Sequence, residues 1–157
     1  MVTPYDPSLL NPASLDIRLG DTAKLRQSGD WLTVHLGRFS ESAPFVLQPN
    51  DRLLVASLEE FSLPPFVCAQ FFLKSSRARE FLEHLHAGFC DPGWHGSKLT
   101  MELVNMDTVP KSLYPGMRIG QMIFSLTMGI PVKDYSKTGR YNGDKFVSGS
   151  KDNGQII

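Results

Sequence analysis

Short runs of β-forming residues, separated by frequent turn signals, constrain the fold of this 157-residue chain more than any other feature. The alternating or continuous apolar patterns of strands recur at residues 14–19, 31–36, 45–47, 52–58, 66–73, 99–104, 110–113 and 118–126. Turns such as Pro49-Asn50-Asp51 separate several of these runs, and the chain holds 13 Gly and 11 Pro. Because nothing resembles a βαβ repeat, the sequence predicts an all-β sandwich or barrel.

One short helix is expected within this β framework. Ser75 and Ser76 are favourable N-cap residues. Apolar side chains then recur at helical spacing within residues 77–85, at Phe81, Leu82 and Leu85. The nearly continuous apolar run 66–73, which precedes this helix, predicts a strand buried on both faces.

The length suits a single domain covering residues 1–157, because a chain of this size buries most of the surface that it exposes when unfolded. Residues 1–13 contain three prolines and no periodicity, which indicates an N-terminal arm. Residues 133–157 contain few large apolar side chains, so we expect a C-terminal tail that is mobile without a ligand or partner.

Because its charges balance, the chain has no strong overall electrostatic field that would attract nucleic acid or a charged membrane. Sixteen Lys and Arg residues balance sixteen Asp and Glu residues, so neither nucleic acid nor a membrane surface is an expected partner, and an anionic ligand needs a local cluster of cations. The longest uncharged run, residues 119–132, is too short to span a bilayer. With no signal pattern at the N-terminus and two cysteines, Cys68 and Cys90, interpreted as buried thiols, we expect a cytoplasmic protein.

Glu102 is the first candidate for chemistry. It lies in the alternating run LTMELVN, on the face opposite Leu99, Met101 and Leu103. If that apolar face enters the core, Glu102 points to the other side of the strand, where it either faces solvent or lines a pocket. A partly buried glutamate with a raised pKa could act there as a general acid and base.

Residues 74–79, KSSRAR, form the second candidate site. They combine two hydroxyls, three cations and an expected helix start, a combination that suits a phosphate chain. A solvated basic turn is the alternative. Since Arg77 and Arg79 point in different directions on a helix, at most one of them is expected to join Ser75 in a tight site.

A protein-bound metal is not expected from the sequence. The His-x-Glu and Pro-Cys-x-x-Cys motifs of zinc nucleobase deaminases are absent. The candidate ligands His84, His86, Cys90 and His95 match no common zinc spacing. Walker-type, dinucleotide-binding and nucleophile-elbow motifs are also absent.

Several motifs in a fixed order resemble the dCTP deaminase branch of the dUTPase-like superfamily. They are NPASLDIRLGD at 11–21, KSSRAR at 74–79, AGFCDPGWHG at 87–96, LTMELVN at 99–105 and PGMRIGQMIF at 115–124. The resemblance spans about residues 11–148. It implies a distorted β jelly-roll that assembles as a homotrimer, with active sites between subunits.

The resemblance also implies a role for each site residue. Glu102 matches the glutamate that activates water for attack at C4 of cytosine, while Ser75 and Arg79 match residues that place this water and complete the site. Further nucleotide-binding positions are implied at Lys74, Ser76, Arg77, Ala78, Ala87, Asp91, Thr100, Met101, Gln121, Tyr135 and Arg140. Mg²⁺ would arrive with the triphosphate, and no zinc would be required.

The activity that the resemblance implies first is hydrolysis of dCTP to dUTP and ammonia. A dUTPase, or a bifunctional enzyme that carries dCTP to dUMP, is the alternative within the superfamily, and a regulatory trimer that binds nucleotides without catalysis is an alternative of another class. Glu102 favours deamination because plain dUTPases typically lack a glutamate at that position.

This chain departs from the family pattern at three places. One extra residue within 95–98 precedes Glu102, and a slip of one residue would turn its side chain to the wrong face unless a bulge absorbs it. His86 replaces a common threonine at a position linked to feedback inhibition by dTTP. Asp144 replaces a glutamine near the phosphates, while Arg140 replaces a lysine and keeps its charge.

Overall fold

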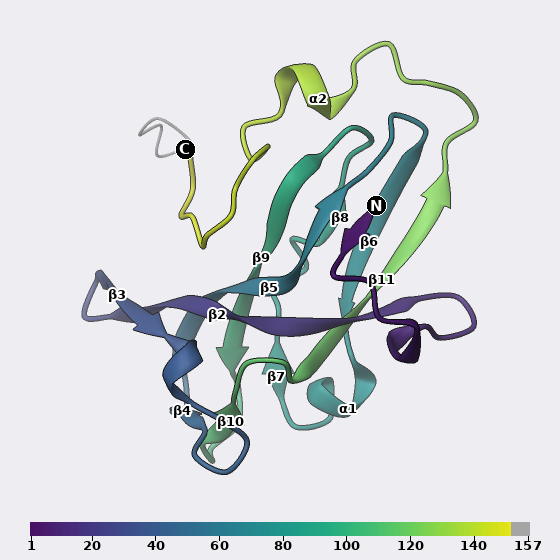
Figure 1. Cartoon of the computed structure of the whole chain (residues 1–157). Coiled ribbons are helices and arrows are strands. Elements are labelled where there is room, and N and C mark those ends of the chain that lie inside the picture. The colour runs from purple at the N-terminus through teal and green to yellow at the C-terminus, as the bar shows by residue number, and fades with distance from the viewer. Residues whose placement is uncertain (152–157) are drawn as a thin grey trace.

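The computed structural model describes residues 1–151 and is almost entirely β (Figure 1). Its strands are β1 Val2–Thr3, β2 Leu15–Gln27, β3 Asp30–His35, β4 Phe45–Leu47, β5 Arg52–Ser62, β6 Val67–Leu73, β7 Leu82–Glu83, β8 Phe89–Cys90, β9 His95–Asn105, β10 Lys111–Leu113 and β11 Arg118–Leu126. Single helical turns lie at η1 Pro7–Leu9, η2 Leu36–Arg38, α1 Ser75–Ala78 and α2 Tyr135–Thr138. Across residues 1–151, no helix is long and apolar enough to cross a membrane.

The strands form one large curled sheet, with an antiparallel pair, β4 and β10, beside it. The large sheet has the order β7-β9-β5-β2-β11-β6-β8, with β1 added to β5 and β3 added to β2. Strand β2 joins both halves, because residues 15–18 pair with β11 and residues 22–27 pair with β3. The sheet therefore bends around a single core, which confirms the predicted all-β class.

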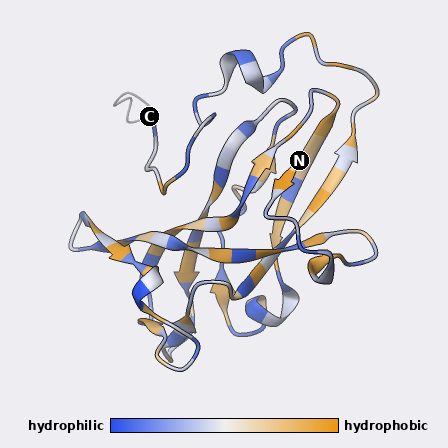
Figure 2. Cartoon of the chain, in the orientation of Figure 1, coloured by the Kyte–Doolittle hydropathy of each residue, from blue (hydrophilic) through white to orange (hydrophobic). Residues whose placement is uncertain are grey.

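The core lies on the inner face of this sheet. Figure 2 shows hydrophobic residues concentrated along β6 and β11 and hydrophilic residues along α2. The fully buried apolar side chains come mainly from β2, β5, β9 and β11, and include Ile17, Leu53, Val55, Met101, Leu103 and Ile119. Burying each such side chain favours folding by about 1.5–3 kcal/mol, so this face fixes which way the opposite side chains point.

Strands β4 and β11 have the predicted bounds, whereas β2, β5 and β9 are longer than expected. The β-forming run predicted from the sequence ends at residue 19, but β2 continues through Gly20 to Gln27. A Cβ atom at Gly20 would lie 2.7 Å from the carbonyl oxygen of Ser57, so glycine permits a close approach of β2 and β5. Gly20 therefore does not end the strand but marks the place where β2 and β5 contact each other closely.

The predicted helix over residues 77–85 is wrong. The helix is the single turn α1, its N-cap is Lys74 rather than a serine, and the chain leaves it through Phe81 with φ of 58°. Leu82 is buried in β7, which pairs with β9, while Leu85 is 58% exposed. A short helix without a buried apolar face is only marginally stable, and strand pairing prevails here.

Two further expectations about burial need correction. Strand β6 alternates buried and more exposed residues, with Gln70 exposed, so it is not buried on both faces. Cys90 is buried as predicted, but Cys68 is only half-buried. Both cysteines are free thiols.

Both ends of the described chain contact the sheet. The N-terminal arm contains β1, which pairs with β5, and the turn η1. In the tail, Val147 is buried and the backbone N–H of Tyr135 donates to the carbonyl of Pro92. The predicted mobility of this tail stays a prediction, and the part of it after residue 151 lies outside the described residues.

Candidate functional site

A cavity of about 700 Å³ opens on the polar side of β9. Its walls come from β9, from the loop and turn between β7 and β9, from the β2–β3 hairpin and from the tail. The predicted site residues that line it are Ala87, Asp91, Thr100, Glu102 and Tyr135. Five side chains that the sequence analysis assigned to one nucleotide site are thus brought together.

Glu102 faces this cavity from the middle of β9. Its neighbours Met101 and Leu103 are 1% exposed in the core, so the alternation of the strand directs Glu102 to the opposite side. Burial raises the pKa of the Glu102 carboxyl above its usual value, and a hydrogen bond from its own backbone offsets part of this rise. The structure therefore supplies the pocket that the catalytic interpretation requires.

A bulge lies within residues 95–98, where the sequence predicts one extra residue relative to the family. Phe61 pairs with Ser97 and Ser62 pairs with His95, which leaves Gly96 unpaired on β9. Gly96 has φ of 62°, a conformation that glycine adopts with little strain. Beyond a second irregularity, at residues 57–59 of β5, residues 52–56 pair in regular register with residues 100–104, and Leu54 pairs with Glu102.

The turn Asp91–Trp94 forms another wall. The backbone N–H of Trp94 donates to the carbonyl of Asp91 over 3.1 Å. Gly93, with φ of 84°, occupies the third position of this turn. Trp94 stacks on the buried ring of Phe61 at 5.5 Å. This packing fixes the turn at residues 91–94.

The tail closes one side of the cavity. The Ser97 hydroxyl donates to the carbonyl of Tyr141 over 2.7 Å, and the backbone N–H of Lys98 donates to the carbonyl of Asp144 over 2.7 Å. The Asp144 carboxylate accepts from Lys151 Nζ at 2.6 Å. An anion at Asp144 would repel a triphosphate, but this ion pair offsets its charge.

The β2–β3 hairpin contributes residues that the sequence analysis did not single out. Arg26 and Trp31 line the cavity, and the Arg26 guanidinium lies 5.0 Å from the centre of the Trp31 ring. Lys98 and Tyr141 also line it. The hairpin is distant in sequence from the other walls of the cavity. In the sequence, the one feature that could have pointed to it was the aromatic residue Trp31 beside a turn.

Other predicted site residues do not line this cavity. Residues 74–79 lie around α1, which Figure 1 shows at the end of the molecule away from α2. Ser75, Ser76 and Arg79 are exposed, Met101 is in the core, and Arg140 is exposed in the tail. The expected pairing of Glu102 with Ser75 is therefore not formed within one chain.

A second polar cluster lies near α1. Asp16, which is 2% exposed, accepts hydrogen bonds from Lys74 Nζ at 2.6 Å and from Asn11 Nδ2 at 2.8 Å. Arg118 lies 3.6 Å from the same carboxylate, and Gln121 accepts from the hydroxyl of Ser14. The predicted nucleotide-binding residues Lys74 and Gln121 thus lie on either side of Asp16, apart from the cavity.

The metal ligands considered from sequence do not assemble as a set. Burial raises the pKa of the Cys90 thiol to about 12, so it remains protonated at neutral pH and is a poor ligand. His84 and His86 lie instead with Glu83. Burial lowers the pKa of His84, which favours its neutral imidazole.

Known proteins resemble this chain over most of its length. The dCTP deaminase-like family matches residues 1–127. A relative from Clavibacter michiganensis subsp. michiganensis, "dCTP deaminase, dUMP-forming", is 36% identical over 162 residues, which cover 94% of this chain and 80% of the relative. A relative of the same name from Nocardioides sp. is 38% identical over 132 residues, covering 77% of this chain and 69% of the relative.

Solved structures share the fold. The 2′-deoxycytidine 5′-triphosphate deaminase from Agrobacterium tumefaciens superposes with a TM-score of 0.60 at 22% identity, over 79% of this chain and 42% of that longer chain. The dUTPase from Streptococcus mutans superposes with a TM-score of 0.55 at 16% identity, over 81% of this chain and 92% of the other. The fold is thus the dUTPase-like distorted jelly-roll. Because the family match and the relatives both cover most of its length, this chain belongs to the dCTP deaminase-like family.

Proposed function

We propose that this protein is an enzyme that hydrolytically deaminates dCTP, with Glu102 as the general acid and base. The observation that carries the proposal is the position of Glu102, in a cavity of about 700 Å³ where burial raises its pKa. A carboxyl in such a place can take a proton from water and later return it. The relatives named dCTP deaminase supply the substrate class.

The proposed step requires no metal ion bound by the protein, because Glu102 itself carries the proton. Glu102 removes a proton from water as the oxygen bonds to C4 of cytosine, and the protonated carboxyl then gives a proton to the departing amine. The hydroxyl of the water thus replaces the amino group, its remaining proton ends on N3 of the uracil, and ammonia leaves. Contacts to the sugar and triphosphate, remote from C4, would hold the base in register.

We propose dUMP as the final product. The relatives are named dUMP-forming, which favours the bifunctional alternative over the dUTP product expected first from the sequence. The dUTP would stay in the site where it forms. A second water would then hydrolyse it there to dUMP and diphosphate. Mg²⁺ bound to the triphosphate would supply charge neutralisation for both steps.

We also propose that a complete site forms between subunits of a homotrimer. The cavity lacks every residue of 74–79, whereas Lys74 and Gln121 lie in a separate cluster. Phe81 and Leu85, which follow α1, and Phe89, which lines the cavity, are each more than half exposed, and such side chains favour burial against another subunit. A neighbouring α1 would then place Ser75 and Arg79 opposite Glu102.

Product analysis tests the proposed activity. Purified protein is incubated with dCTP and Mg²⁺, and the nucleotides are separated with time. Accumulation of dUMP with release of ammonia supports the bifunctional proposal, whereas dUTP alone would restrict the enzyme to deamination. Binding of dCTP without turnover would favour the regulatory trimer instead.

Feedback by dTTP is tested in the same assay. His86 stands where the family commonly has threonine, and its imidazole is 80% exposed beside Ala87 of the cavity wall. We propose that dTTP inhibits this protein less than it inhibits relatives with threonine. An equal inhibition of the wild type and of the His86→Thr variant would contradict that role.

A further inference from the structure

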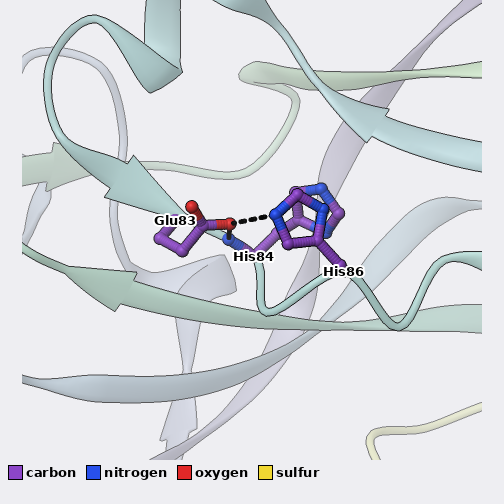
Figure 3. A group of neighbouring side chains, drawn as sticks. All are labelled: Glu83, His84 and His86. Carbon is purple, nitrogen blue, oxygen red and sulfur yellow. Dashed lines mark hydrogen bonds and ion pairs between the residues drawn. The ribbon is translucent and has the colours of Figure 1, made fainter.

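Three potential metal ligands converge on the loop between β7 and β8. They are a carboxylate oxygen of Glu83 and ring nitrogens of His84 and His86, and all lie within 4.8 Å of one another. Figure 3 shows both imidazole rings on the side reached by the Glu83 carboxylate, with the contact between Glu83 and His86 drawn as a dashed line. In this contact Glu83 Oε1 lies 3.8 Å from His86 Nε2.

The backbone of this loop creates the convergence. Leu85 and His86 are successive residues with left-handed φ values of 56° and 58°. Such a conformation costs roughly 1–2 kcal/mol for each residue other than glycine. It turns the chain back on itself, so that the imidazoles of His84 and His86, two positions apart, lie 4.9 Å apart.

Packing and pairing orient two of the three ligands before any ion binds. The His84 ring is 5% exposed and meets the edge of Phe71 at 5.4 Å. Glu83 belongs to β7, where it pairs with Val104 of β9, and its Oε1 accepts a hydrogen bond from the backbone N–H of His84 at 2.7 Å. His86 is 80% exposed, so its side chain has freedom to move toward the other two.

The donor set identifies the class of ion. Two neutral imidazoles and one carboxylate are ligands for Zn²⁺, Co²⁺, Ni²⁺ or Fe²⁺, whereas Mg²⁺ prefers oxygen ligands alone. Metal–ligand bonds of about 2.0–2.2 Å bring the donor atoms of one ion close together. The three donor atoms must therefore move closer to one another than in the metal-free protein, where they lie within 4.8 Å. Three protein ligands leave at least one position open to water or to another donor.

We propose that Glu83, His84 and His86 bind one divalent transition-metal ion. This site is separate from the proposed reacting centre, because none of its three residues lines the cavity that contains Glu102. It is nevertheless adjacent in sequence to Ala87, which does line that cavity. Binding of the ion requires neither nucleotide nor catalysis, so it can be measured without assuming the proposed reaction.

Titration of the metal-free protein with Zn²⁺, without an affinity tag, tests the site by calorimetry, and Co²⁺ reports ligation through its visible absorption. We expect saturation at one ion per chain and no displacement by millimolar Mg²⁺. The variants His86→Ala and Glu83→Gln should each weaken binding by about 100-fold, since loss even of outer-shell partners costs 10–100-fold. Glu83→Gln keeps an acceptor for the His84 N–H.

The control is His35→Ala, which removes an exposed histidine from β3, outside the cluster. It should bind Zn²⁺ as the wild type does, and circular dichroism should show that all three variants are folded. Absence of saturable binding would overturn the proposal. Unchanged affinity in a folded His86→Ala variant, or equal competition by Mg²⁺, would overturn it as well.

Discussion

At the scale of single residues, the proposed chemistry depends on the environment of Glu102. Its carboxyl is half-buried, and desolvation raises its pKa, so the proton affinity of the group is tuned by the cavity rather than by a neighbouring charge. The direction of this side chain could be predicted from the alternation of Leu99, Met101 and Leu103. The contributions of Arg26 and Trp31 could not, because the hairpin that carries them reaches the cavity only in the folded chain.

Replacing Glu102 with Gln should abolish deamination while keeping the fold. General acid and base groups typically contribute 10²–10⁴-fold, so we expect a fall in rate of at least about 100-fold. The matched control is Glu41→Gln, which changes an exposed glutamate that accepts from Tyr114 outside the cavity. Ammonia release from dCTP measures both variants, and a near-normal rate for Glu102→Gln would exclude Glu102 as the base.

The same substitution should not reduce stability at pH 8. The pKa of Glu102 is raised in the folded protein, so its stabilising contribution is present below the unfolded value of 4.5 and is lost as the pH rises through the folded pKa. At pH 8 a partly buried charge remains, which Gln does not carry. We expect the variant to melt at or above the wild-type temperature at pH 8, and a clearly lower melting temperature would contradict the assigned cause of the shift.

At the scale of elements, irregularities in strand pairing set the site. Alternation predicted most strands, because burial of one face imposes a period of two. The helix predicted over residues 77–85 failed because Leu82 is buried where β7 pairs with β9, a contact between segments distant in sequence. Bulges depend on such long-range register too, so the sequence could suggest a bulge within residues 95–98 but could not place it at Gly96.

Gly96→Ala tests this bulge. The added methyl group has room, with its nearest neighbour at 3.9 Å, but φ of 62° strains a residue with a Cβ atom. We expect a loss of unfolding free energy of about 1–2 kcal/mol and a lower rate of deamination. Gly129→Ala is the control, because nothing lies within 4 Å of its Cβ position and its φ is not positive. Equal stability of the two variants in urea would show that the bulge tolerates a side chain.

A buried ion pair supports the other bulge in the same strand pair. Glu59 is fully buried at the point where three residues of β5 oppose one residue of β9. Its carboxylate accepts hydrogen bonds from Arg18 Nε at 2.7 Å and from the backbone N–H of Arg18 at 2.9 Å. Breaking such a pair typically costs about 3–5 kcal/mol, so Glu59→Gln should lower the urea midpoint strongly. Glu80→Gln, which removes an exposed partner of Arg77, should change stability by less than about 1 kcal/mol. Similar effects of both changes would refute the role of burial.

At the scale of the whole molecule, the proposed site residues of one chain lie in two separate places. Its cavity holds Glu102, Asp91 and Tyr135, while α1 presents Ser75 and Arg79 elsewhere on its surface. The motifs assigned these residues to one nucleotide site, but their spacing along the chain could not show that they lie in two separate groups on one subunit. In a cyclic trimer each cavity would meet the α1 of a neighbour.

Subunit mixing tests this arrangement and the proposed reaction together. Glu102→Gln and Arg79→Ala proteins, each inactive alone, are mixed in equal amounts, unfolded and refolded together, and assayed for conversion of dCTP. If each site takes Glu102 from one subunit and Arg79 from another, random mixing restores about one quarter of the sites. Recovery of about one quarter of the activity of identically treated wild-type protein is the predicted result. A mixture as inactive as its two parents, beside an active wild type, would contradict a site shared between subunits.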